Sequence, residues 1–342
     1  MFEHESCLYV GGSRRDHGRL RMKAVRFDHY GDVDVLDVRD VDDPVAAPGQ
    51  VVVKVRAAAA NPGDIYVREG LAEQAWALRA RLSGRASDTP LPSMTFPAGQ
   101  GTDLAGQIVA VGAGVERWHV GDDVLGWSDE RVSHAELVAV AADHLVTKPA
   151  GMSWEVAGSM YVAPMAALAS VETVSPAPGE TIVVSGAAGA VGVVAVQLAR
   201  RTGAAVIGLT SQANHAWMRD HGITPVTYGD GQAARIRSAA GGRVDAFIDT
   251  FGADYVDLAH ELGVPAKRVN TVVDFHAALD GRAGIAGTND AGGAAGLQHL
   301  VDLVATGELD IPIAATYPLT NVRKAYQLVA ERRTHGKIVL VP

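Results

Sequence analysis

The sequence has little cysteine, no excess of positive charge and no long apolar run, and each absence excludes a class of protein. Cys7 is the one cysteine among 342 residues, so no intramolecular disulfide can form and a thiolate-rich zinc site is excluded. The formal net charge is −9. This acidity argues against binding to nucleic acid or to an anionic membrane, since both need a basic surface. No uninterrupted apolar run approaches the roughly 20 residues of a membrane span.

The remaining composition is that of an ordinary globular enzyme. Hydrophobic residues make up 48% of the chain and charged residues 20%, which is enough apolar material for a sizeable core. The length suggests two domains or one large one. Residues 1–21 are polar and charged and lack the apolar centre of a signal peptide. We therefore expect a disordered N-terminal extension and a cytoplasmic protein.

Short β segments broken by glycine and proline occupy the first part of the chain. Strand-like patterns begin at Met22 and recur at Val51–Arg56, Gly106–Val111 and Gly121–Gly126. This spacing is typical of a β-rich, barrel-like domain. Residues 71–97 do not fit, because a helix-like stretch there leads into a segment rich in Ser, Gly and Pro. We interpret them as an exposed insertion or a lid.

The pattern changes near residue 148. A helical, alanine-rich stretch is followed by apolar strands that alternate with helices. This alternation predicts a parallel, doubly wound sheet. From residue 292 the sequence holds two helical stretches and a last strand. The expected elements are a helix at Trp154–Thr173, strands at Thr181–Ser185, Ala205–Leu209, Val244–Asp249 and Lys337–Val341, and helices at Val191–Arg201 and Ala213–Asp220.

The turn after the first parallel strand, Gly186–Gly192, carries the strongest functional signal. A phosphate-binding turn needs a strand that ends there, small residues that let backbone N–H groups approach a pyrophosphate, and a helix whose positive end faces the anion. The sequence predicts all three at this point. Ala187 fills the first slot of the usual three-glycine pattern. The prediction of a bound nicotinamide dinucleotide therefore depends on the strand–turn–helix context.

The end of the second strand indicates which dinucleotide binds. Sites for NAD usually carry Asp or Glu there, to bond the ribose 2′-hydroxyl. Here the strand is followed by Ser211 and Asn214, and the next acid, Asp220, lies inside the following helix. No carboxylate is placed to repel a 2′-phosphate, and two neutral donors are placed to bind one. This pattern favours NADP(H).

Several short motifs follow one another along the chain: Tyr30-Gly31, Asn61–Gly70, Gly101–Gly106, Val111–Val115, Gly121-Asp122, the glycine turn and His335–Leu340. Together, in this order, they resemble the zinc-independent quinone oxidoreductase branch (zeta-crystallin-like) of the medium-chain dehydrogenases/reductases. The similarity covers nearly everything from residue 22 to residue 342. Asn214 departs from the family, which often has Lys there, and so does Met165, where a Thr is common.

The resemblance implies an α/β protein made of two domains. A GroES-like, β-rich substrate domain would span residues 22–147, with the 71–97 insertion. A Rossmann domain, a doubly wound parallel sheet that binds NADP(H), would span residues 148–291. Residues 292–342 would return to complete the substrate domain. The family also implies metal-free reduction of a quinone, enone or alkenal, and a homodimer.

The resemblance also assigns site residues. Asn61 and Tyr66 would face the nicotinamide and the substrate, and Lys337 would reach the cofactor. The remaining cofactor contacts would lie on the glycine turn, near the 2′-phosphate, and beside the ribose and ring. These are, respectively, Gly186, Ala187, Gly189, Ala190, Val191 and Gly192; Ser211, Asn214 and Tyr228; and Thr250, Gly252 and Val272.

Reduction of an enone or quinone builds negative charge on a carbonyl oxygen, and a nearby donor lowers that barrier. Tyr66 is the best donor candidate and Asn61 the second. Asp64 is expected to brace its own loop, and Asp103 to hold strand ends together. Short-chain dehydrogenase chemistry is excluded, because none of the eight tyrosines has Lys four residues later. Two alternatives stay open: a pathway-specific enoyl reductase acting on a bulky or thioester-linked enone, and a non-catalytic NADPH-binding sensor or interaction protein.

Overall fold

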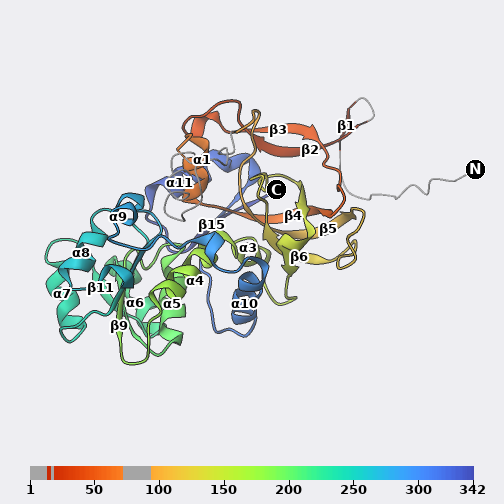
Figure 1. Ribbon diagram of the computed structural model, residues 1–342. Coiled ribbons are helices and arrows are strands. Elements are labelled where there is room, and N and C mark those ends of the chain that lie inside the picture. The colour runs from red at the N-terminus through yellow and green to blue at the C-terminus, as the bar shows by residue number, and fades with distance from the viewer. Residues whose placement is uncertain (1–13, 17–18, 72–93) are drawn as a thin grey trace, which may run out of the picture.

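The structure is a computed structural model that describes residues 14–16, 19–71 and 94–342. Almost all of the insertion expected at residues 71–97 lies outside these residues. The described chain forms a β-rich part, which contains β2 to β6, and an α/β part, which contains β9 and helices α5 to α9 (Figure 1). Every helix of the described part is too short or too polar to cross a bilayer.

The β-rich part contains a three-stranded sheet in the order β1-β2-β3 and a larger, seven-stranded sheet. The larger sheet runs β14-β15-β4-β5-β6-β8, with β7 also paired to β4. Strand β15, near the C-terminus, pairs antiparallel with β4, so segments far apart in the sequence build this sheet. The strands are β1 Arg14–Asp16, β2 Arg19–Arg26, β3 Asp37–Asp42, β4 Gln50–Ala60, β5 Asp103–Val111, β6 Asp123–Trp127, β7 Leu137–Ala141, β8 Leu145–Thr147, β14 Ile313–Pro318 and β15 Lys337–Val341.

The α/β part is built on a five-stranded, wholly parallel sheet in the order β11-β10-β9-β12-β13. Successive side chains of a strand point to opposite faces. Ile182 and Val184 accordingly join one apolar core, while Val183 between them joins another. The sheet is therefore covered on both faces. The strands are β9 Thr181–Val184, β10 Ala205–Thr210, β11 Thr224–Thr227, β12 Ala246–Asp249 and β13 Val269–Thr271.

Helices divide between the two faces of this sheet. Residues of α4, α5 and α10 pack in the core that contains Ile182, and residues of α7, α8 and α9 pack in the core that contains Val183. The helices are α1 Pro62–Arg68, α3 Trp154–Ala157, α4 Val162–Val174, α5 Gly192–Arg201, α6 His215–Asp220, α7 Gln232–Ala239, α8 Tyr255–Glu261, α9 Phe275–Leu279, α10 Gly293–Ala305 and α11 Val322–Glu331.

The predicted fold class is confirmed, and the differences concern short elements. Strand β2 begins at Arg19 and pairs with β1, so part of the expected N-terminal extension is strand. The helix expected at Trp154–Thr173 is broken into α3 and α4. Strands β11, β13 and β14 are additional to the expected elements.

Candidate cofactor and substrate site

The glycines of the turn between β9 and α5 have different roles. A Cβ on Gly192 would lie 2.3 Å from the carbonyl oxygen of Gly186, so Gly192 is required by the protein's own packing. A Cβ on Gly189 would meet only that same oxygen, at 3.3 Å, so the space beyond Gly189 is open. The first N–H groups of a helix have no intrahelical partner. An open backbone at the start of the ten-residue helix α5 therefore fits a pyrophosphate group.

The structure corrects the expected role of Ala187. This residue is fully buried, and its N–H donates to the carbonyl oxygen of Leu209 at 3.0 Å. It therefore ties the turn to β10 instead of lining a ligand. Gly189, Ala190 and Val191 are half-buried and form the accessible part of the turn.

Asp249, at the end of β12, fixes the neighbouring strand ends, although the sequence did not single it out. One carboxylate oxygen accepts from Ser185 Oγ at 2.6 Å and from the Gly252 N–H at 2.9 Å. The backbone oxygen of Asp249 accepts from the Val272 N–H at 3.0 Å. The Thr250 hydroxyl donates to the Ser185 carbonyl at 2.7 Å. Three predicted cofactor residues thus lie around one buried carboxylate at the carboxyl edge of the sheet.

Ser211, Asn214 and Tyr228 come together where β10 and β11 end, because Thr210 pairs with Thr227 in register. Asn214 Nδ2 donates to Thr210 Oγ1 at 3.2 Å and to Ser211 Oγ at 3.1 Å. Both of its donors are used, which corrects the expectation that this amide donates to a phosphate. The Ser211 hydroxyl keeps its own hydrogen to donate, and Tyr228 is 52% exposed.

The start of β15 joins the glycine turn to the β-rich part. Gly336 donates its N–H to the carbonyl of Ala188 at 3.0 Å and forms a bridge with Gly189. Its φ is +87°, and a Cβ there would lie 2.1 Å from the carbonyl oxygen of Pro312. Only glycine fits this position, so the approach to the turn is built into the backbone.

The structure places Asn61 and Lys337 in a buried network. Both side chains are almost fully buried, and Lys337 Nζ donates to Asn61 Oδ1 at 2.6 Å. Asn61 Nδ2 donates to Asp103 Oδ2 at 2.8 Å, and the other oxygen of Asp103 accepts from the Tyr161 and Val162 N–H groups at the start of α4. Burial lowers the pKa of Lys337, although Asp103 and then Asp64 act to raise it.

Burial changes the roles predicted for Asn61 and Lys337. The Asn61 amide is occupied by protein partners, so it has no donor to offer a substrate carbonyl. Lys337 is not a surface charge, and its observed partner is Asn61. Both residues fix the start of α1, and with it the position of Tyr66.

A second buried cluster, not foreseen from the sequence, holds α1 against α11. Asp64 accepts from the Asn61 N–H at 2.9 Å, which caps α1, and from the Tyr326 hydroxyl at 2.9 Å. His134 Nε2 lies 3.2 Å from the carbonyl oxygen of Ala59. A carbonyl only accepts, so Nε2 carries the proton and Nδ1 faces the Tyr326 hydroxyl at 3.4 Å. Burial lowers the pKa of His134 and raises that of Tyr326.

Tyr66 lies on α1 and is 49% exposed, unlike the buried residues that anchor its helix. It is the one residue of the predicted substrate pair whose polar group stays accessible. In the residues that the structure describes, no three His, Cys, Asp or Glu side chains are placed to hold a metal ion.

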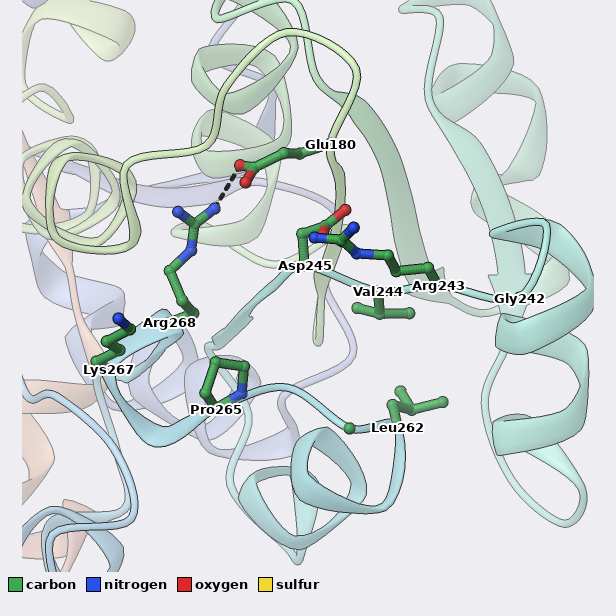
Figure 2. Close-up of a pocket in the computed structure, with 10 residues that line it drawn as sticks. Glu180, Gly242, Arg243, Val244, Asp245, Leu262, Pro265, Lys267 and Arg268 are labelled. Atoms are coloured by element: carbon green, nitrogen blue, oxygen red, sulfur yellow. Dashed lines mark hydrogen bonds and ion pairs between the residues drawn. The ribbon is translucent and has the colours of Figure 1, made fainter.

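A depression of about 360 Å³ lies at the opposite edge of the parallel sheet (Figure 2). Its lining includes Glu180, Asp245 and Arg268, which directly precede β9, β12 and β13. Figure 2 shows the ion pair between Glu180 and Arg268 at this depression. Ligands of open parallel sheets bind beyond the carboxyl ends of the strands. This depression is therefore separate from the candidate site.

Two family models match the chain. The model described as an alcohol dehydrogenase GroES-like domain matches residues 47–169, which include α1 and most of the larger sheet. The model described as a zinc-binding dehydrogenase matches residues 220–340, which include β12, β13 and most of β15.

Known proteins are similar to most of this chain. A quinone oxidoreductase of Pseudomonas aeruginosa is 28% identical over 94% of this chain and 99% of its own length. A 2-methylene-furan-3-one reductase of Solanum lycopersicum is 34% identical over 56% of this chain and 47% of its own length. The solved structure of an NAD-dependent alcohol dehydrogenase is 25% identical, with a TM-score of 0.79, over 94% of this chain and the whole of that one.

Proposed function

The chain belongs to the medium-chain dehydrogenases/reductases, in their quinone oxidoreductase branch, and from this premise we propose an NADPH-dependent reductase that transfers hydride to a quinone, enone or alkenal without a metal. Membership makes the protein a nicotinamide-nucleotide oxidoreductase. The choice of NADPH and of the substrate class is our proposal.

The open backbone at Gly189 is the observation that carries the proposal. It lies at the amino end of α5 and beside the strand ends that Asp249 fixes, which is where a dinucleotide binds in an open parallel sheet. The exit of β10 carries Ser211 and no carboxylate, which supports NADPH over NADH. The alcohol dehydrogenase in the comparison is named as NAD-dependent, so the cofactor preference needs its own measurement.

A bound nicotinamide would supply the hydride. The backbone N–H groups of the turn would hold the pyrophosphate, and the strand ends at Thr250 and Val272 would orient the ribose and ring. Tyr66 donates a hydrogen bond to the carbonyl oxygen on which charge develops and passes on a proton, directly or through water. Asn61 and Lys337 keep α1, and so Tyr66, in place.

The proposal is tested by mixing the protein with NADPH and 9,10-phenanthrenequinone and following absorbance at about 340 nm, with rates compared to those for a panel of enones and alkenals. We expect rapid NADPH oxidation by at least one of these classes, and no oxidation by the Gly189→Val variant. Tight NADPH binding without turnover across the whole panel would overturn the proposal of an enzyme and favour a cofactor-binding sensor.

A second candidate is an enoyl or enone reductase with a narrow substrate range. The similarity to a protein named 2-methylene-furan-3-one reductase favours it, because that name describes reduction of a conjugated enone. The two candidates predict different ratios of kcat/KM for enones and quinones. If kcat/KM for an enone exceeds that for every quinone by about tenfold or more, the narrow enone reductase is favoured.

A further inference from the structure

The exit of β10 holds an ionisable side chain that is not among the predicted cofactor residues. From Ala205 to Asn214 no residue carries a charge, and His215 follows directly. It is the first residue of α6 and is half-buried. The residues that precede it include Ser211 and Asn214, which the sequence placed near a 2′-phosphate.

The His215 imidazole is directed toward the carboxyl edge of the sheet. Its Nε2 lies 3.3 Å from Oγ1 of Thr227, the last residue of β11. Tyr228 follows Thr227 and is 52% exposed. A hydroxyl both donates and accepts. Thr227 can therefore hold the imidazole in either protonation state.

The other charged groups nearby are committed elsewhere or lie further along their elements. Arg235 of α7 donates to the carbonyl oxygens of Thr227, Gly229 and Asp230, so its guanidinium braces the β11–α7 loop. On α6, Arg219 lies one turn after His215 and is exposed, as is Asp220 beside it. Asp230 is exposed at the start of the α7 loop. Arg235 and His215 both contact Thr227 at the end of β11, but the Arg235 guanidinium donates to three backbone carbonyl oxygens, so the His215 imidazole is the one of the two that is left to meet a ligand as a cation.

We propose that protonated His215, together with the Ser211 hydroxyl, recognises the 2′-phosphate of NADPH, so that selectivity for NADPH over NADH rises as the pH falls. This inference rests on the NADPH preference proposed above. Imidazole is the side chain that changes its charge between about pH 5 and 8. A ribose phosphate carries close to two negative charges above its second pKa of about 6. Where the phosphate is doubly charged and the imidazole is protonated, the two groups attract each other. The attraction weakens as the imidazole loses its proton.

The test is a comparison of adenosine 2′,5′-bisphosphate with 5′-AMP, which differ only in the 2′-phosphate, by calorimetry between pH 6.5 and 8.5. A charged contact at a half-exposed site contributes about tenfold in affinity. A contact made only by the protonated imidazole is lost progressively over that interval, and we expect an about fivefold loss of selectivity. The ratio of the dissociation constants of NADH and NADPH is measured in the same way, through the fluorescence of the reduced nicotinamide.

Two variants and a control isolate His215. His215→Gln should lower selectivity at pH 6.5 by about fivefold and make it independent of pH, whereas His215→Lys should keep it high at both pH values. His299→Gln, at an exposed position of α10, should behave like the unmodified protein. Thermal melting of each variant establishes that it folds.

The outcomes separate the inference from the proposed function. Equal affinities for NADPH and NADH at every pH would overturn the NADPH preference itself, and the role of His215 with it. A preference for NADPH that persists unchanged in His215→Gln, or that is flat with pH, would overturn only the role of His215.

Discussion

At the scale of the residue, Tyr66 is the proposed hydrogen-bond donor to the substrate carbonyl. A well-aimed donor to a developing oxyanion contributes about 10²–10³ in rate, but Tyr66 is half exposed, and water can replace part of its contribution. We therefore expect Tyr66→Phe to lower kcat by about tenfold, with the Kd for NADPH unchanged. Steady-state rates and fluorescence titration measure the two quantities. Tyr317→Phe, on β14, is the matched control, and an unchanged kcat in Tyr66→Phe would remove Tyr66 from the reaction.

Two glycines of the cofactor turn provide a second prediction at this scale. The space beyond Gly189 is open, whereas a Cβ on Gly192 would lie 2.3 Å from a carbonyl oxygen. Gly189→Val should therefore abolish NADPH binding and leave the melting temperature nearly unchanged. Gly192→Ala should lower the melting temperature, because the backbone has to shift. A Gly189→Val variant that still binds NADPH would show that the pyrophosphate does not lie on this turn.

At the scale of the element, the hydroxyl of Tyr326 joins α11 to α1 through Asp64. Tyr326→Phe preserves the ring and removes one buried hydrogen bond to a carboxylate. Such a bond contributes about 1.5–3 kcal/mol. We expect the free energy of unfolding in urea to fall by about 2 kcal/mol and kcat to fall with it as α1 loosens. Unchanged stability would mean that the Asp64 carboxylate is satisfied by Asn61 alone.

Elements with a strong local pattern were predictable, and elements defined by tertiary contacts were not. The β9–turn–α5 unit combines an apolar strand, small residues and a helix within about 20 residues, so the sequence reveals it. Strand β13 has three residues and β11 contains a proline, so neither shows a period of its own. Asp249 and the Asn61–Lys337 pair join positions far apart in the chain, and no local signal places them together. The β9–turn–α5 unit could therefore be predicted from the sequence, whereas these long-range contacts could not, and the roles of the turn and of Tyr66 stay predictions.

At the scale of the whole molecule, the start of β15 connects the two parts of the site. Gly336 contacts the glycine turn, Lys337 holds Asn61 at the start of α1, and Ile338 to Leu340 pair with β4. Gly336 and the strand that follows it thus contact the cofactor turn, the start of α1 and β4 in succession. A displacement of this strand would move the cofactor turn and the Tyr66 helix together, which gives the site a common support.

The stability of the whole molecule should depend on pH through its buried histidines. Burial lowers the pKa of His134, despite the nearby Asp64. It also lowers the pKa of His335, where Asp310 acts against burial and His221 adds to it. A histidine with a lowered folded-state pKa is neutral in the fold and takes up a proton on unfolding. Its contribution to stability is present above the unfolded-state pKa of about 6.5 and is lost as the pH falls toward the folded-state pKa.

Between pH 7.5 and 5.5 we therefore expect the free energy of unfolding to drop by about 1 kcal/mol, with most of the drop below pH 6.5. The half-buried His335 should contribute less than His134. Carboxylates titrate largely below this interval, so the net charge of −9 changes little there and does little to oppose the loss of stability.

Urea unfolding at several pH values measures how steeply the free energy of unfolding falls with pH. This dependence should be shallower in His134→Gln and unchanged in His299→Gln. A free energy that stays constant or increases on acidification would contradict the assignment of His134 as a buried neutral base.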